Sequence, residues 1–253
     1  MNKFNIAQAK RQTGLSYIGG VSLSSKMEKS ENYNELTYVI YLAPAKLSGY
    51  NVCPQASSHC IAACLHESGQ NRMDIHENRI NKARIKKTKL FYEDRELFVR
   101  WTVEEIRKAK AKADKEGKAF SVRLNGTSDL SPELFKLDGK NILEIFPDIQ
   151  FYDYTKVAKR LTLVNKYPNY DLTYSFSGDN WEQCEQALGE GFRISVVFDK
   201  LPQQHLGYKV VDGDIYDMRY KDPSNCIVGL KFKKVRTKID FSSTPFVIQT
   251  NCG

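Results

Sequence analysis

The sequence has 253 residues, of which 41% are hydrophobic and 11% aromatic, and it carries a net charge of +8. It is long enough to build one globular domain around a large core. No stretch approaches the roughly 20 apolar residues of a membrane span, and the start, MNKFNIAQAKRQTG, lacks the apolar segment of a secretory signal. We therefore expect a cytoplasmic protein with no membrane partner, in which six cysteines indicate metal binding or catalysis before disulfides.

Residues 1–34 are polar and in part rich in Gly and Ser, which predicts an N-terminal arm ahead of a single domain over 35–253. Eight short runs rich in Val, Ile, Tyr and Phe follow, a composition typical of strands buried on both faces. These runs are residues 37–44, 119–126, 149–156, 171–178, 193–199, 208–214, 226–233 and 245–250.

Helical patterns fill several gaps between these runs, at residues 70–117, 131–146 and 180–190, with Asn180 as a candidate N-cap. Alternating strands and helices favour a parallel sheet, and eight strands favour an α/β fold of the (β/α)8-barrel type. The last connections are too short for full helices, so we expect the barrel to be irregular or partly open near its end.

Three cysteines lie in the loop after the first predicted strand, NVCPQASSHCIAACLHESG, residues 51–69. Cys60 and Cys64 are one helical turn apart and share a face, and Cys53 approaches from the preceding loop. Thiolates are ligands of iron–sulfur clusters and of zinc. The usual second Cys or His pair of a zinc site is missing, so the pattern favours a cluster, with zinc and buried or redox thiols as alternatives.

A fourth cluster ligand would have to come from elsewhere in the chain. Cys226 opens a strand and so lies at the opposite rim, and Cys184 falls in a helix. Cys252 follows the last strand, which neighbours the first in a closed barrel, so Cys252 is the candidate fourth ligand. The alternative is a frayed C-terminal cysteine, which would leave one iron open to a substrate or cofactor.

Polar residues gather where several predicted strands end, in RLNGTSD (123–129), YDYTK (152–156) and SFSGDN (175–180). The carboxyl ends of barrel strands carry the active-site loops, so this pattern indicates a ligand pocket, with Gly126 letting the ligand approach the backbone. The candidate ligand-binding residues are Asn125, Asp129, Tyr154, Lys156 and Ser175. The alternatives are an ordinary turn at 123–129 and a pairing of Lys156 with Asp153.

Two charged segments have two interpretations each. The acidic stretch 210–223 could hold Mg²⁺ or Ca²⁺, although ion pairs with Arg219 and Lys221 are favoured. Basic residues concentrate at 82–118, a helical face that could contact a nucleic-acid backbone or lie in solvent.

The separated motifs resemble those of a known family. The order C-P-x-A-S-x-x-C-x-x-x-C-L, RLNGTSD, FYDYTK, LTYSFS, VVFD, VVDGD-x-x-D-x-R and VGLK, over roughly residues 37–233, resembles the phage gene product 88-like family. This resemblance implies a bacteriophage protein that acts in the host cytoplasm. A more distant likeness to radical S-adenosylmethionine enzymes implies a 4Fe–4S cluster with S-adenosylmethionine, although C-x6-C-x3-C differs from their C-x3-C-x2-C spacing.

Three functions remain open from the sequence. The first is an iron–sulfur protein or enzyme that carries out redox or radical-type chemistry on a bound ligand. The second is a nucleic-acid-associated phage protein with a structural cluster. The third is a non-catalytic protein that binds a host partner.

Overall fold

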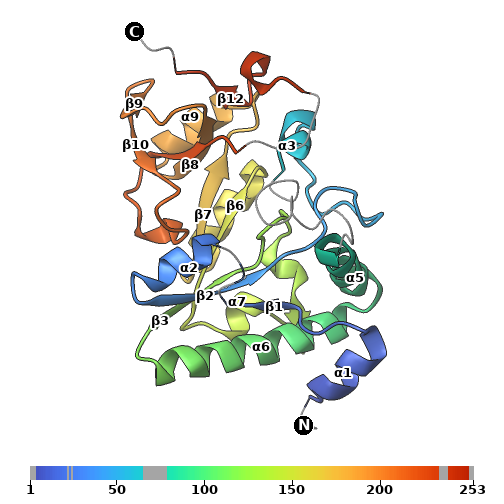
Figure 1. Cartoon of the computed structure of the whole chain (residues 1–253). Coiled ribbons are helices and arrows are strands. Elements are labelled where there is room, and N and C mark those ends of the chain that lie inside the picture. The colour runs from blue at the N-terminus through green and yellow to red at the C-terminus, as the bar shows by residue number, and fades with distance from the viewer. Residues whose placement is uncertain (1–3, 22, 24, 65–78, 234–238, 251–253) are drawn as a thin grey trace.

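The computed structural model describes residues 4–21, 23, 25–64, 79–233 and 239–250. Within them a ten-stranded, mostly parallel sheet runs in the order β1-β2-β3-β6-β7-β8-β11-β10-β9, with β12 paired to β8 (Figure 1). The strands are β1 Gly19–Gly20, β2 Glu35–Ile40, β3 Ala119–Arg123, β6 Gln150–Thr155, β7 Tyr170–Ser175, β8 Arg193–Phe198, β9 Gln204–His205, β10 Tyr208–Asp212, β11 Ile227–Lys231 and β12 Val247–Ile248. Each of the eight predicted runs overlaps one of these strands.

The predicted (β/α)8 barrel is wrong, because the sheet is open. A closed barrel requires the first and last strands to pair. Instead β1 pairs antiparallel with β2 at one end, and β9 pairs antiparallel with β10 at the other. The last strand, β12, pairs with Val197 and Phe198 of β8, beyond the point where β7 pairs with residues 193–195. The final strand therefore fills a gap within the sheet and does not close it.

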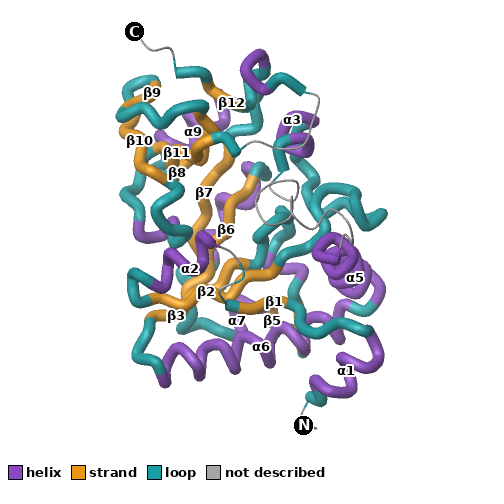
Figure 2. The backbone as a smooth tube through the Cα atoms, in the orientation of Figure 1, coloured by secondary structure: helices purple, strands orange, loops and turns teal. Residues whose placement is uncertain are grey.

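Helices pack around this sheet (Figure 2). They are α1 Ile6–Thr13, α2 Ser25–Glu31, α3 Ser58–Ala62, α5 Arg79–Glu93, α6 Arg95–Lys115, α7 Ile142–Ile145, α8 Leu163–Lys166 and α9 Trp181–Gly189. The pattern at 70–117 gives α5 and α6, which Asp94 separates by accepting a bond from the Leu97 N–H as N-cap. Within the described residues, no helix is long and apolar enough to cross a membrane.

The helix predicted over residues 131–146 is for the most part wrong. The segment holds a short 3₁₀ turn, the hairpin β4 Lys136–Leu137 and β5 Lys140–Asn141, and only then α7. Asp138 and Gly139 both have positive φ, 50° and 81°, which is the conformation of a two-residue hairpin turn. The Asp-Gly turn signal therefore outweighed the apolar spacing.

The two faces of the sheet differ in character. One face is apolar, with Leu36, Val122 and Phe151 buried, and Tyr38 on this face bonds to Glu105 of α6. The other face is polar although it too is buried, and successive strands each contribute polar side chains to it. These polar residues include Thr37, Ser121, Tyr152, Thr173 and Ser195. Strand alternation therefore assigns each residue of a strand to one of two chemically distinct layers.

The N-terminal segment packs onto this framework. The Glu105 carboxylate accepts bonds from the Ile18 and Gly19 N–H groups, at 3.1 and 2.9 Å, and from the Tyr38 hydroxyl at 2.8 Å. Ala9, Leu15 and Ile18 belong to the main hydrophobic core. A domain boundary at residue 34 stays a prediction.

Candidate functional site

The loops that follow β2 and β3 lie side by side at the carboxyl edge of the sheet, because the two strands are parallel and adjacent. The Asp129 N–H donates to the Val52 carbonyl at 2.8 Å, and the Thr127 hydroxyl donates to the Leu42 carbonyl at 2.6 Å. A Cβ on Gly126 would lie 2.6 Å from the Tyr41 ring. This glycine therefore admits Tyr41 rather than a ligand, which corrects the sequence-based interpretation.

The cysteine loop is held at this edge by side-chain bonds. The Cys53 N–H donates to Asn51 Oδ1 at 3.0 Å, and its Sγ lies 3.8 Å from the Thr127 carbonyl. Ser57 caps α3 by accepting from the Cys60 N–H at 3.1 Å, and its hydroxyl donates to the Ser177 carbonyl at 2.8 Å. These bonds connect the cysteine loop to the loops after β3 and β7.

The three thiols are close enough to interact electrostatically. The pKa of Cys53 is raised to about 12, chiefly by burial and in addition by the nearby Cys64, Asp129 and Cys60. A thiol with so high a pKa is protonated at neutral pH in the metal-free protein, so Cys53 is not an activated nucleophile.

Two cations lie beside these thiols. Burial lowers the pKa of Lys156, yet that pKa is raised overall because the negative charges of Cys60 and Asp129 stabilise the ammonium form. Burial lowers the pKa of Arg84, on α5, while Tyr41 and Cys64 oppose this effect. Arg84 is only 8% exposed, and in the part of the chain that the structure describes neither cation forms an ion pair with a carboxylate.

No three His, Cys, Asp or Glu side chains among the described residues converge as ligands of one metal ion. The candidate fourth ligand, Cys252, lies outside the described residues. Its expected position beside the first strand relied on barrel closure, which the open sheet removes. The preceding segment nevertheless packs against α3, since Cys60 and Ala62 pack against the cluster that Phe241, Phe246 and Val247 form.

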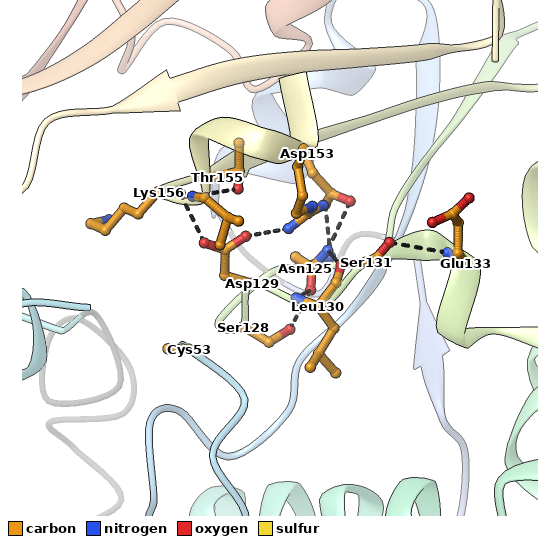
Figure 3. Close-up of polar contacts among 12 residues, drawn as sticks. Cys53, Asn125, Ser128, Asp129, Leu130, Ser131, Glu133, Asp153, Thr155 and Lys156 are labelled. Carbon is orange, nitrogen blue, oxygen red and sulfur yellow. Dashed lines mark hydrogen bonds and ion pairs between the residues drawn. The ribbon is translucent and has the colours of Figure 1, made fainter. Parts of the chain in front are cut away.

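Asn125 is the centre of a buried network (Figure 3). Its backbone N–H and Nδ2 both donate to the Asp153 carboxylate, at 2.8 and 2.9 Å, and Nδ2 also donates to the Leu130 carbonyl. Its Oδ1 accepts from the Ser128 hydroxyl and the Leu130 N–H, both at 2.8 Å. Every hydrogen-bonding group of this side chain is thus engaged in shaping the loop.

Asp129 is engaged in the same way. Its carboxylate accepts from the Lys156 N–H at 2.8 Å and pairs with Arg160. Arg160 also donates to the Tyr170 hydroxyl at 2.6 Å, which in turn donates to Asp153 at 3.1 Å. Burial raises the pKa of Asp153 to about 6, although Arg160 and Asn125 lower it. The Lys156 side chain extends away from this network (Figure 3).

Tyr154 and Ser175 lie on the other, polar face of the sheet. Arg123 stacks over the Tyr154 ring at 4.7 Å, and the Tyr154 hydroxyl has no hydrogen-bond partner within the described residues. The Ser175 hydroxyl bonds to that of Ser195 at 3.0 Å. The structure therefore brings Asn125, Asp129 and Lys156 together with the cysteines and places the other two candidates elsewhere.

Asp153, Arg160 and Arg84 also belong to this edge and were not predicted from the sequence. Asp153 could have been found, because a carboxylate inside an apolar strand requires a buried partner. The partners themselves come from other elements and carry no local signal.

The acidic segment 210–223 forms ion pairs, of which the expected pairing with Arg219 is present and that with Lys221 is not. Arg219 pairs with Asp222 at 3.0 Å, and Asp217 pairs with Arg123 at 2.7 Å. Lys221 instead pairs with Glu35 at 2.5 Å.

Comparison with known proteins gives one family and no individual relative. No curated protein and no solved structure matches the chain, so the likeness to radical S-adenosylmethionine enzymes is not shown. A family model described as Gene product 88 matches residues 9–244. The chain therefore belongs to the Gene product 88 family of phage proteins.

Proposed function

We propose that the cysteine loop holds an iron–sulfur cluster through Cys53, Cys60 and Cys64, at the carboxyl edge of the sheet. The observation that carries this proposal is the pair of cations, Lys156 and Arg84, beside Cys60 and Cys64. Removing a charge from water costs several kcal/mol unless an opposite charge compensates. Cluster-bound thiolates are anionic and would supply that compensation.

The donor set fits a cluster better than a single ion. Two thiolates on one zinc, each about 2.3 Å from the metal, would be roughly 4 Å apart, and the described residues contain no such convergent group of three. An all-sulfur donor set is the usual ligand set of iron–sulfur clusters. When bound, the cluster would supply one-electron chemistry, redox or radical in type. Lys156 and Arg84 would balance its charge, and Asp129 would hold the loop in place.

The test is anaerobic reconstitution with iron and sulfide, followed by visible absorbance and analysis of iron and labile sulfide. We expect a coloured protein whose iron and sulfide fall to background in Cys53→Ala, Cys60→Ala and Cys64→Ala. Cys226→Ala is the matched control, because this thiol is buried and donates to the Pro223 carbonyl, and this variant should keep the cluster. A colourless protein that binds zinc, or equal loss in the control variant, would refute the proposal.

The fourth ligand is tested separately with Cys252→Ser. The residues from Phe241 to Val247 already pack beside Cys60, and four extended residues beyond Ile248 reach about 14 Å. We therefore expect Cys252→Ser to lose cluster iron as the other three variants do. Retained iron, together with a changed electron paramagnetic resonance spectrum on adding S-adenosylmethionine, would instead indicate an open iron that binds this cofactor.

A further inference from the structure

Helix α5 presents a row of basic side chains that the carboxylates of the described residues do not neutralise. It carries six basic residues and one acidic residue, a net charge of 6 − 1 = +5. Lys82, Lys86 and Lys89 are exposed, recur at helical spacing and form no ion pair within the described residues.

The neighbouring helix α6 is different, although the sequence places both helices in one basic segment. On α6 Lys110 pairs with Asp114 at 2.5 Å, and Arg107 pairs with Glu104 at 2.6 Å. Lys112 lies 3.7 Å from Glu116. Lys108 and Lys115 of α6 form no such pair within the described residues, but the larger share of the unneutralised charge of segment 82–118 lies on α5.

A pocket of about 220 Å³ lies between α5 and the loop Gly14–Tyr17 that follows α1. Arg79, Lys82, Lys86 and Lys87 line it, and none of its lining residues in the described ranges is acidic. No acidic residue occurs anywhere in the first 27 positions of the sequence, so the loop side of the pocket adds no negative charge.

Lys87 is the buried member of this set. It is 4% exposed, its Nζ lies 3.9 Å from the centre of the Tyr17 ring, and within the described residues it makes no hydrogen bond or ion pair. Its closest acidic influence is Glu105, whose carboxylate already accepts three bonds from Ile18, Gly19 and Tyr38. Among the described residues, this ammonium group has no anionic partner in hydrogen-bonding contact.

Tyr17 lies at the same pocket and is 43% exposed. Lys87 covers one part of the ring, and the remainder is open to solvent. An exposed aromatic ring beside a basic groove is the combination with which proteins bind single-stranded nucleic acid, because every base has a face that can stack.

We propose that this pocket binds single-stranded nucleic acid, with Lys82, Lys86 and Lys87 contacting backbone phosphates and Tyr17 stacking on a base. The row from Lys82 to Lys89 is about 10 Å long at 1.5 Å per residue, which is long enough to contact more than one backbone phosphate. A duplex would keep its bases stacked on one another and out of reach of Tyr17.

The test is fluorescence anisotropy of a labelled oligothymidylate over a series of salt concentrations. Each phosphate contact contributes about −0.7 to the slope of log K against log salt for a single strand. Lys82→Ala/Lys86→Ala should therefore make the slope shallower by about 1.4 and weaken binding about 25-fold at about 0.1 M salt. Lys110→Ala/Lys112→Ala removes the same charge from α6 and should leave both quantities unchanged.

The stacking role has its own pair of variants. Tyr17→Leu should weaken binding at least 5-fold, and Tyr17→Phe, which keeps the ring, should bind as the wild type does. Thermal melts by circular dichroism check that each variant is folded. Equal weakening by the α6 variant, equal affinity for a duplex, or full competition by inorganic phosphate would overturn the proposal.

Discussion

The buried carboxylate of Asp153 should make the stability of this protein depend on pH in an unusual direction. Asp153 is fully buried, and burial raises its pKa from 3.8 to about 6. The folded protein therefore holds this proton more tightly than the unfolded chain. Between these two pKa values the free energy of unfolding should rise as the pH falls. A carboxylate in an ion pair usually has the opposite effect, because its folded-state pKa is lowered and its contribution to stability is lost as the pH falls.

The magnitude follows from the size of the shift. A change from 3.8 to about 6 corresponds to about 3 kcal/mol at 1.36 kcal/mol per pKa unit. The full gain in the free energy of unfolding is reached only below the pKa of the unfolded chain. Lowering the pH from 7 to about 5 at constant temperature should add about 1 kcal/mol to it. For a chain of this size that raises the melting temperature by roughly 2–4 °C.

Urea unfolding of the wild type and of Asp153→Asn at the two pH values measures this contribution. The variant should be about 2 kcal/mol less stable at pH 7, because an amide cannot accept all the bonds from Asn125 and Tyr170. It should also lack the gain at pH 5. Asp148→Asn, at an exposed turn, is the matched control and should behave as the wild type. An identical pH dependence in wild type and Asp153→Asn would refute this reasoning.

Three further substitutions test the packing of the framework. Glu105→Gln weakens the bonds from Ile18, Gly19 and Tyr38, so chemical denaturation should show a loss of about 2 kcal/mol and proteolysis should reach the N-terminal segment sooner. Gly126→Ala should lower stability by about 1–3 kcal/mol, because its Cβ would lie 2.6 Å from the Tyr41 ring. Gly189→Ala is the contrasting case, since nothing lies within 4 Å, and thermal melts should show a gain of up to about 1 kcal/mol.

The positions of the strands were predictable from the sequence, whereas the open edges of the sheet were not. Each of the eight runs is dense in β-branched and aromatic residues, a signal that depends on local composition alone. Closure depends on which edges remain unpaired, and β1 and β9 are only two residues long, too short to give a pattern. The position of β12 beside the carboxyl half of β8 is a long-range pairing that no local signal carries.

The sequence predicted which edge of the sheet carries the candidate site, but not which of its side chains are free to bind a ligand. Parallel strands place their following loops together, and this rule holds for an open sheet as it does for a barrel. The rule does not say which polar groups remain free. Asn125 and Asp129 lie at the expected edge, yet the polar atoms of their side chains form hydrogen bonds that hold the loop. Alternation assigns Tyr154 and Ser175 to the same face of the sheet, but it also groups Lys156 with Tyr154, so it could not have separated Tyr154 from the site.

At this edge of the sheet one set of residues fixes the positions of the loops, and a second set supplies charge beside the thiols. The network from Asn125 through Asp153 and Arg160 to Asp129 fixes the loop after β3. That loop in turn holds the cysteine loop through backbone bonds to Leu42 and Val52. The thiols are thus positioned by residues that need not touch a ligand, while Lys156 and Arg84 supply the charge beside them. Changes in the first set should act through stability, and changes in the second through the affinity for an anionic group, because a buried cation favours whatever negative charge lies next to it.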